Sequence, residues 1–221
     1  NNREIYVNYI PLSNEEHTET AIKAINNNKH VLIEKPMAIK SKEVELLVDS
    51  AKTNNVKIME GFMYVFHTQF DRIQNIINSG ILGDVNYAHS MFSFPIQAAR
   101  FYRINRSIAN GGGALWDIGP YAIHTIRSCF KENPKRVYAQ SKLNEQGADI
   151  STTGMIDFGF DKKATFDISF ECVRRSEFEV FGQSGRLKCP QIWQPDNLPA
   201  KIIYSTEKSG LKEEVVPTAN H

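Results

Sequence analysis

The 221-residue chain is long enough to bury a sizeable core, and its 41% apolar and 23% charged residues match an ordinary globular domain. Its 26 Lys and Arg residues balance 25 Asp and Glu residues, which argues against a nucleic-acid partner, since binding phosphates needs clustered cations. No apolar run reaches the roughly 18 residues of a membrane span, so we expect no membrane partner.

The first sixty residues alternate apolar runs with amphipathic segments. Runs at 5–10, 30–33 and 56–59 predict three buried strands. We expect Asn14 to cap a helix that begins at Glu15 and Ser41 to cap a second helix. This alternation predicts an α/β fold with a parallel, doubly wound sheet.

A sheet of this kind opens with a strand and a glycine-rich turn that cradles a pyrophosphate. The only glycine cluster here, Gly111-Gly112-Gly113, has a different spacing and lies well after the three strands. We therefore expect residues 1–60 to be the C-terminal part of a Rossmann domain whose first βαβ unit is missing from the sequence.

Beyond residue 60 the pattern changes. Apolar spacing over 66–77 predicts one more helix. Alternating runs then predict two hairpins, one that pairs 155–160 with 164–170 and one that pairs 178–181 with 186–189. We expect residues 61–221 to form an α+β domain with a large, mostly antiparallel open sheet. Residues 218–221 complete no further element, which suggests that this domain is cut short.

Two motifs carry chemistry. Glu34-Lys35-Pro36 follows the second predicted strand, and ligands of open α/β sheets bind at carboxyl ends of strands. Taken alone, Lys35 is explained more simply as an exposed lysine in a loop. After the three glycines, Asp117, Tyr121 and His124 recur at helical spacing, with Asp117 as the expected N-cap.

Taken one at a time, these three side chains have structural explanations: Asp117 as a helix cap, Tyr121 as a core ring and His124 as a core histidine. Together, behind three glycines that let the backbone approach a partner closely, they indicate a site. The nearby Arg100, Arg103 and Arg106 are explained most simply by a solvated loop.

These motifs resemble the glucose–fructose oxidoreductase, inositol dehydrogenase and rhizopine-catabolism (Gfo/Idh/MocA) family, with Glu34-Lys35-Pro36 ahead of a GGGALWDIGPY helix. Segments 9–17, 60–67 and 179–186 are also similar to that family, so the resemblance covers nearly the whole chain. Most members carry histidine where this chain has Tyr121. Tyrosine there resembles the branch of dihydrodiol and xylose dehydrogenases.

The resemblance implies a dehydrogenase that uses NAD or NADP and acts on a sugar or polyol-like alcohol or its carbonyl form. It implies a Rossmann domain for the cofactor and an open sheet that supplies the substrate face and a homodimer interface. Its cofactor-binding residues would be Pro11, Leu12, Asn14, His17, Glu34, Lys35 and Pro36.

The same resemblance makes Lys35, Asp117 and Tyr121 the catalytic residues, and we expect no metal. The substrate-binding candidates are Tyr64, His67, Arg103 and His124. Oxidising an alcohol requires a base at its hydroxyl, and free tyrosine titrates near pH 10. We therefore expect the Lys35 ammonium to lower the pKa of Tyr121 and Asp117 to orient Lys35 or a sugar hydroxyl. His124 is the rival base.

Two further expectations concern context. Cys129, Cys172 and Cys189 are too scattered for a disulfide framework or a zinc site, which suits a reducing compartment such as the cytoplasm. The alternative to an enzyme is a non-catalytic homologue that senses nucleotide or binds a protein partner. Retention of both Lys35 and Tyr121 favours the enzyme.

Overall fold

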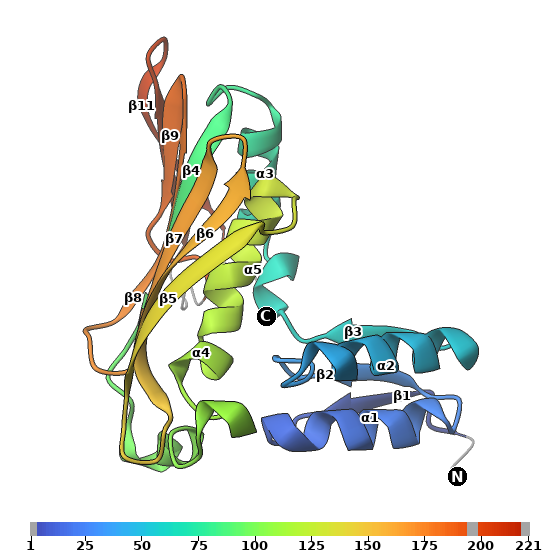
Figure 1. Ribbon diagram of the computed structural model, residues 1–221. Coiled ribbons are helices and arrows are strands. Elements are labelled where there is room, and N and C mark those ends of the chain that lie inside the picture. The colour runs from blue at the N-terminus through green and yellow to red at the C-terminus, as the bar shows by residue number, and fades with distance from the viewer. Residues whose placement is uncertain (1–3, 194–198, 218–221) are drawn as a thin grey trace.

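The structure, a computed structural model, describes residues 4–193 and 199–217. Figure 1 shows two parts that meet at a corner: a small layered part, and a tall sheet that carries helices on one side. The small part contains β1 (Val7–Ile10), the 3₁₀ turn η1 (Asn14–Glu16), α1 (His17–Ile25), β2 (His30–Ile33), α2 (Ser41–Thr53) and β3 (Ile58–Glu60).

The tall part follows without a break in the chain. Its first elements are η2 (Met63–Phe66), α3 (Thr68–Asn78), β4 (Val85–Ser93), η3 (Ala98–Arg103), η4 (Ile108–Asn110), α4 (Ala114–Asp117) and α5 (Gly119–Phe130). Its remaining strands are β5 (Arg136–Leu143), β6 (Asp149–Gly159), β7 (Lys162–Ser169), β8 (Arg175–Gly182), β9 (Gly185–Cys189), β10 (Ala200–Thr206) and β11 (Gly210–Val216).

The small sheet is parallel, in the order β1-β2-β3, as predicted. Each crossover is a helix, and α1 and α2 contact one another, so both cover the same face of the sheet. Ile10, Ile25, Ile33 and Leu47 fill the core beneath them. The carboxyl ends of β1 and β2 consequently lie side by side, which brings the segments after Ile10 and after Ile33 together.

Both predicted helix caps are wrong. Helix α1 begins at His17 after the turn η1, and Asn14 donates its side-chain N–H to Gly111 O instead (2.7 Å). Ser41 is the first residue of α2, and Lys40 stands at the cap position without a side-chain cap bond. The carboxylate of Glu43 reaches back to Ile39 N–H (3.3 Å), so a side chain from inside the helix serves this end.

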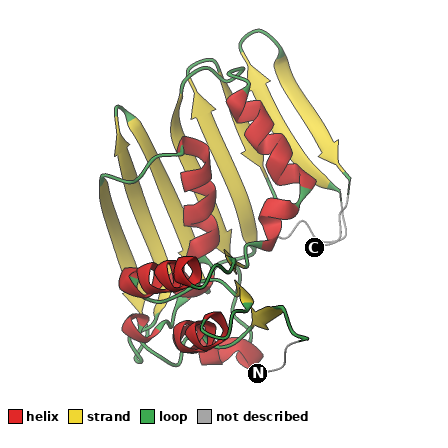
Figure 2. Ribbon diagram, turned by 90° about the vertical axis from the view of Figure 1, so that its right-hand side faces the viewer, coloured by secondary structure: helices red, strands yellow, loops and turns green. Residues whose placement is uncertain are grey.

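The tall sheet has the order β11-β10-β9-β8-β4-β7-β6-β5, and every neighbouring pair is antiparallel except β4 with β7. The large, mostly antiparallel sheet is therefore confirmed, as are the β6–β7 and β8–β9 hairpins. At the β6–β7 turn both Phe160 and Asp161 take positive φ. Figures 1 and 2 agree that α3 and α5 cover one face of this sheet. Phe166, Ile168 and Phe170 are buried.

The helix expected over 66–77 begins later than its apolar spacing suggests. Phe66 belongs to η2 and is 68% exposed, and α3 starts at Thr68. The ring of His67 accepts a hydrogen bond from Gln69 N–H (3.0 Å), which caps α3 and fixes its start.

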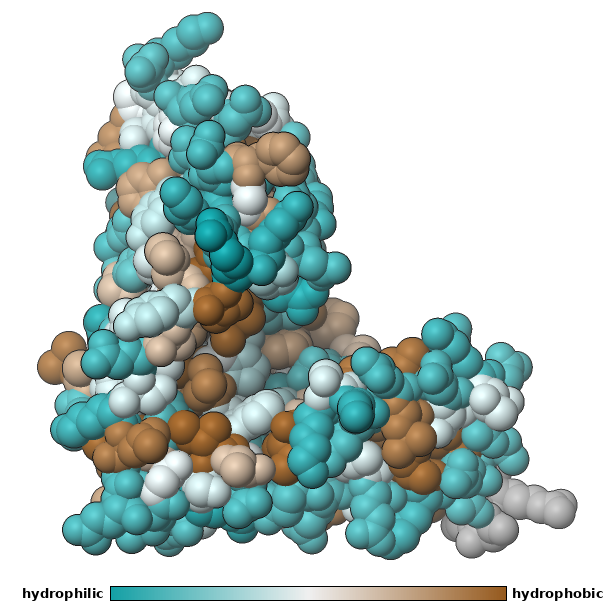
Figure 3. Space-filling model, in the orientation of Figure 1, coloured by the Kyte–Doolittle hydropathy of each residue, from teal (hydrophilic) through white to brown (hydrophobic). Residues whose placement is uncertain are grey.

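The surface changes character along the molecule. In Figure 3 the upper tip of the tall sheet is hydrophilic, whereas apolar residues gather lower down, toward the corner where the two parts join. Among the described residues, no helix is both long and apolar enough to cross a bilayer. The expectation for 218–221 lies outside the described residues.

Candidate active site

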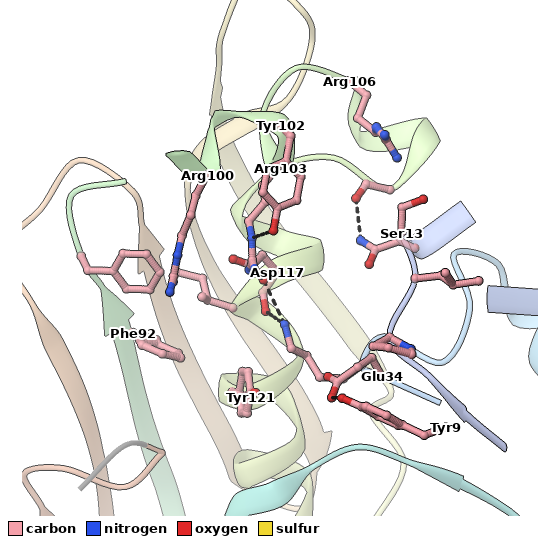
Figure 4. A pocket seen from close by; sticks show the side chains of 18 residues that line it. Tyr9, Ser13, Glu34, Phe92, Arg100, Tyr102, Arg103, Arg106, Asp117 and Tyr121 are labelled. Atoms are coloured by element: carbon pink, nitrogen blue, oxygen red, sulfur yellow. Dashed lines mark hydrogen bonds and ion pairs between the residues drawn. The ribbon is translucent and has the colours of Figure 1, made fainter. Parts of the chain in front are cut away.

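A cleft of about 440 Å³ lies at the corner between the two parts. Its first wall is formed by residues that follow β1 and β2, and its second by the end of β4, the η3–η4 segment and helices α4 and α5. Figure 4 shows how its side chains converge from these elements. The lining residues are Tyr9, Pro11, Leu12, Ser13, Asn14, Glu34, Lys35, Phe92, Phe94, Arg100, Tyr102, Arg103, Arg106, Gly111, Gly113, Asp117, Ile118 and Tyr121.

The central contact of the cleft joins Lys35 to Asp117. The Lys35 ammonium donates to the Asp117 carbonyl oxygen (2.7 Å) and to its Oδ1 (2.9 Å). Both side chains are nearly buried, with 11% and 10% of their surface exposed. The lysine of the first wall and the aspartate of the second therefore form one buried ion pair across the cleft.

Asp117 carries a second cation. Arg103 donates Nη1–H to Asp117 Oδ1, the oxygen that Lys35 also uses, while Asp117 Oδ2 is buried without a partner. Burial by itself would raise the pKa of Asp117, but the charges of Lys35 and Arg103 outweigh burial and lower the pKa below its usual value. Asp117 is thus a carboxylate whose second oxygen can still accept a donor.

Two more contacts tie the walls together. Asn14 bonds to Gly111 O, and Arg106 pairs with Glu15. With the Lys35–Asp117 pair, these contacts fasten the segments after β1 and β2 to the glycine loop. The two walls of the cleft are therefore joined by contacts within the chain itself.

The glycine loop permits an approach that no side chain would allow. Gly113 has φ +106°, and a Cβ there would lie 1.9 Å from Asp149 Oδ1. Asp149 is fully buried, and its Oδ2 accepts from Leu115 N–H (2.8 Å) and Thr152 Oγ1–H (2.7 Å). Burial raises the pKa of Asp149. The loop thus packs directly on a buried carboxyl group that holds the start of α4.

The expectation that Asp117 caps a continuous helix is wrong. Asp117 is the last residue of α4, and α5 begins at Gly119 after the intervening Ile118. Pro120 has no N–H to donate and suits the first turn of α5. The break frees the carbonyl and carboxylate of Asp117 to meet Lys35 instead of serving a helix end.

Tyr121 lies on the cleft wall beside this pair. Lys35 Nζ is 5.1 Å from the centre of its ring. Burial raises the pKa of Tyr121, the charges of Glu34 and Asp117 raise it further, and only Arg103 opposes them. The expectation that Lys35 lowers this pKa is wrong for this arrangement, because Asp117 accepts both hydrogen bonds that the lysine donates.

Of the substrate-binding candidates, Arg103 lines the cleft and three lie behind it. Tyr64 and His67 are buried in the core, so neither is on the surface that a ligand meets. The Tyr64 hydroxyl bonds to His124 Nδ1 (2.5 Å) and Thr125 Oγ1 (2.9 Å). His124 stacks on Phe62 (4.5 Å between ring centres), and burial, then the charge of Arg127, lowers its pKa.

Of the cofactor-binding candidates, Pro11, Leu12, Asn14, Glu34 and Lys35 line the cleft. His17 and Pro36 lie behind them. The buried His17 ring contacts Pro36 O (2.8 Å) through Nδ1 and Leu12 O (3.0 Å) through Nε2, so it ties the two strand-end segments together. The Lys35–Pro36 peptide bond is cis.

Sequence reasoning missed several lining residues. On the first wall they are Tyr9, which donates to Glu34 (2.6 Å), and Ser13. On the second wall they are Phe92, Phe94, Arg100, Tyr102, Arg106 and Ile118, whereas the lining residues Gly111 and Gly113 belong to the glycine cluster that the sequence had singled out. Arg100, Arg103 and Arg106 did stand out in the sequence, but their spacing carries no sign that the segment folds over a cleft.

The first wall suits a nicotinamide dinucleotide. It lies at the carboxyl ends of parallel strands, where such cofactors bind in this architecture, and the cleft volume is that of a small-ligand site. The orphaned Oδ2 of Asp117 offers an acceptor for a hydroxyl or amide donor. Among the described residues, no group of three or more His, Cys, Asp or Glu side chains is placed to hold a metal ion.

Two family models match the chain. Residues 1–62 match the model described as an oxidoreductase family with an NAD-binding Rossmann fold, and residues 70–188 match the GFO/IDH/MocA C-terminal domain.

Named relatives and a solved structure agree with this match. The D-xylose 1-dehydrogenase (NADP(+)) 2 of Haloferax volcanii is 31% identical over 96% of this chain and 65% of its own length. The trans-1,2-dihydrobenzene-1,2-diol dehydrogenase of Xenopus laevis is 28% identical over 88% and 59%. The aldose-aldose oxidoreductase from Caulobacter crescentus, complexed with glycerol, superposes with a TM-score of 0.88 at 22% identity, over all of this chain and 66% of its own. The chain thus spans about three fifths to two thirds of the length of these proteins.

Proposed function

Because this chain belongs to the GFO/IDH/MocA family of oxidoreductases, we propose that it serves hydride transfer between NAD or NADP and a sugar-like or cyclic molecule. The reacting group is a secondary alcohol or the corresponding carbonyl. The observation that carries the proposal is the buried Lys35–Asp117 pair, which joins the strand-end wall to the helix wall directly beside Tyr121. We take residues 1–60 as the cofactor half and residues 61–221 as the substrate half.

The cofactor, when bound, supplies or accepts the hydride, and Pro11, Leu12, Asn14, Glu34 and Lys35 would hold it. The residues of the chain manage the proton and the charge. The Tyr121 phenol is protonated at neutral pH and burial raises its pKa further, so Tyr121 is set to donate a proton to a carbonyl oxygen.

Arg103 places a positive charge near Tyr121, where a carbonyl oxygen gains negative charge during reduction. Such preorganised charge stabilises a transition state without reorganisation at the moment of reaction. Asp117 holds Arg103 and Lys35 in position and keeps Oδ2 available for a substrate hydroxyl. In the oxidative direction Tyr121 would act as the base.

The test uses the full gene product with NADPH or NADH and a panel of ketoses and cyclic ketones. Tyr121→Phe keeps the ring and removes the proton donor, so kcat is expected to fall by about 100-fold or more while the cofactor Kd stays the same. Tyr6→Phe is the matched control, since Tyr6 is 73% exposed and does not line the cleft, and it is expected to retain full activity.

A loss of less than tenfold in Tyr121→Phe would exclude Tyr121 as the main acid or base. If His124→Asn removed turnover instead, His124 would hold that role. Saturable cofactor binding without turnover of any substrate would support the non-catalytic homologue.

We also propose a homodimer and a cytoplasmic setting without nucleic-acid partners. The face of the tall sheet opposite α3 and α5 is wide, and β5 at its edge is exposed along its whole length, with Val137 and Tyr138 more than 60% exposed. Cys129, Cys172 and Cys189 are all free thiols, which suits a reducing compartment. The near-neutral net charge does not favour nucleic acid.

A further inference from the structure

Arg100 differs from the other cations of the cleft because no described residue provides a counter-charge for it. Lys35 and Arg103 both pair with Asp117, and Arg106 pairs with Glu15. Within residues 4–193 and 199–217, the Arg100 guanidinium forms neither a hydrogen bond nor an ion pair. Arg100 nevertheless lines the cleft.

The position of Arg100 favours a ligand over simple solvation. In Figure 4 its side chain extends from η3 into the space bounded by Phe92, Asp117 and Tyr121. Arg100 itself is exposed to solvent, and Phe92 and Phe94 give that end of the cleft an apolar floor. A planar guanidinium in such a place suits bidentate bonding to a carboxylate or phosphate.

The opposite wall of the cleft carries a negative charge. Glu34 lines the cleft on the β2 side and accepts a hydrogen bond from Tyr9, a neutral group that leaves its charge uncompensated. An anion in the cleft is therefore repelled from the Glu34 wall and attracted to the Arg100 wall. Glu34 and Arg100 therefore determine the orientation in which an anionic molecule binds in the cleft.

We propose that Arg100 determines specificity for an anionic sugar derivative, with the carboxylate or phosphate at Arg100 and the reacting carbon beside Tyr121. The inference rests on the proposed function, because it names the substrate class of the same site. Carboxylate and phosphate share this oxyanion chemistry, and the experiment separates them.

The experiment uses the full gene product, with NADP(H) present, and three ligands matched in their ring: D-glucose, D-glucuronate and D-glucose 6-phosphate. Calorimetric titration gives the Kd of each, and kcat/KM is measured alongside. The protein is expected to bind one or both anions about tenfold more tightly than glucose, and Arg100→Gln is expected to remove that preference. The anion with the larger gain is the group that Arg100 recognises.

Arg186→Gln is the charge-matched control, since Arg186 is exposed on β9, away from the cleft, and should keep the preference. Arg100→Lys should retain part of it, because lysine keeps the charge and loses the fork geometry. Equal or absent binding of the anionic ligands in the unmodified protein would overturn the proposal, as would an equal loss for all three ligands in Arg100→Gln.

Binding does not require hydride transfer, so the two proposals fail separately. A charge preference in binding with no turnover would support the role of Arg100 and contradict the oxidoreductase. Turnover without a charge preference would support the oxidoreductase and contradict the role of Arg100.

Discussion

The two walls of the cleft are held in place by different means. On the β1–β2 wall, the lining residues follow strand ends, and the buried His17 ring joins their backbone through Leu12 O and Pro36 O. On the α4–α5 wall, a glycine loop lies on the buried Asp149, and Asp117 carries two cations.

This difference has an energetic consequence. The first wall keeps its shape through strand pairing and the buried His17 ring, so changes to its exposed side chains should matter little. The second wall depends on a missing Cβ and on the balance of buried charges, so small chemical changes there should cost much more. Three substitutions test this contrast.

The largest effect is expected from Gly113→Ala. The new Cβ would lie 1.9 Å from Asp149 Oδ1, at a φ of +106° that alanine rarely adopts. We expect a loss of about 3 to 5 kcal/mol of stability, measured as a shift of the urea midpoint. Gly80→Ala is the control: φ is also positive (+73°), but no atom lies within 4 Å of its Cβ, so only about 1 kcal/mol of strain is expected. Equal losses would show that backbone strain, and not the close approach, decides this wall.

Asp117→Asn should follow. It leaves Lys35 and Arg103 without their counter-charge, at a cost of about 2 to 4 kcal/mol at pH 7. Burial alone would raise the pKa of Asp117 above its usual value of 3.8. In the folded protein the charges of Lys35 and Arg103 outweigh burial and lower the pKa of Asp117. Its contribution to stability is therefore complete above about pH 4 and is lost as the pH falls through the folded-state pKa.

Unfolding curves collected between pH 2 and pH 7 would test both parts of this prediction. The free energy of unfolding of Asp117→Asn should fall less from pH 7 to pH 2, because the carboxylate that acid would protonate is gone. Asp71→Asn, on the exposed side of α3, should keep the full pH dependence. Parallel pH profiles for the original protein and Asp117→Asn would contradict the charge balance described for this wall.

The smallest effect is expected on the other wall, from Tyr9→Phe. The Tyr9 hydroxyl donates to Glu34 at 2.6 Å, but Tyr9 is 55% exposed, so water can replace the bond. The free energy of unfolding should change by less than about 0.5 kcal/mol. A loss above 1 kcal/mol in the same urea experiment would mean that exposed side chains also hold the first wall.

The two walls also differed in how far the sequence predicted them. Runs of apolar residues around Ile10 and Ile33 predicted parallel strands, and parallel strands bring their carboxyl ends to one edge, so the place of Lys35 followed from topology. On the second wall, Asp117, Tyr121 and His124 were assigned to one face of one helix. The break at Ile118 turns Asp117 to Lys35, while His124 turns away to Tyr64.

Other misses have equally local causes. Strand β5 is exposed at every position, so it leaves no alternating apolar signal to detect. The pKa of Tyr121 was mispredicted because burial of the side chain, followed by the charges of Glu34 and Asp117, raises it, and only the folded arrangement determines that environment.

The tight contact between Gly113 and Asp149 also affects how such a protein can diversify. The glycines of this loop have almost no acceptable replacements, because each added carbon would displace a neighbouring atom. Residues 100–102 of η3, ahead of Arg103, are under no such restriction: Phe101 and Tyr102 are about half exposed, and Arg100 beside them has no internal partner among the described residues. Under the proposed function, natural variation at residues 100–102 can therefore alter substrate choice while the glycine loop stays unchanged, so recognition can evolve separately from catalysis.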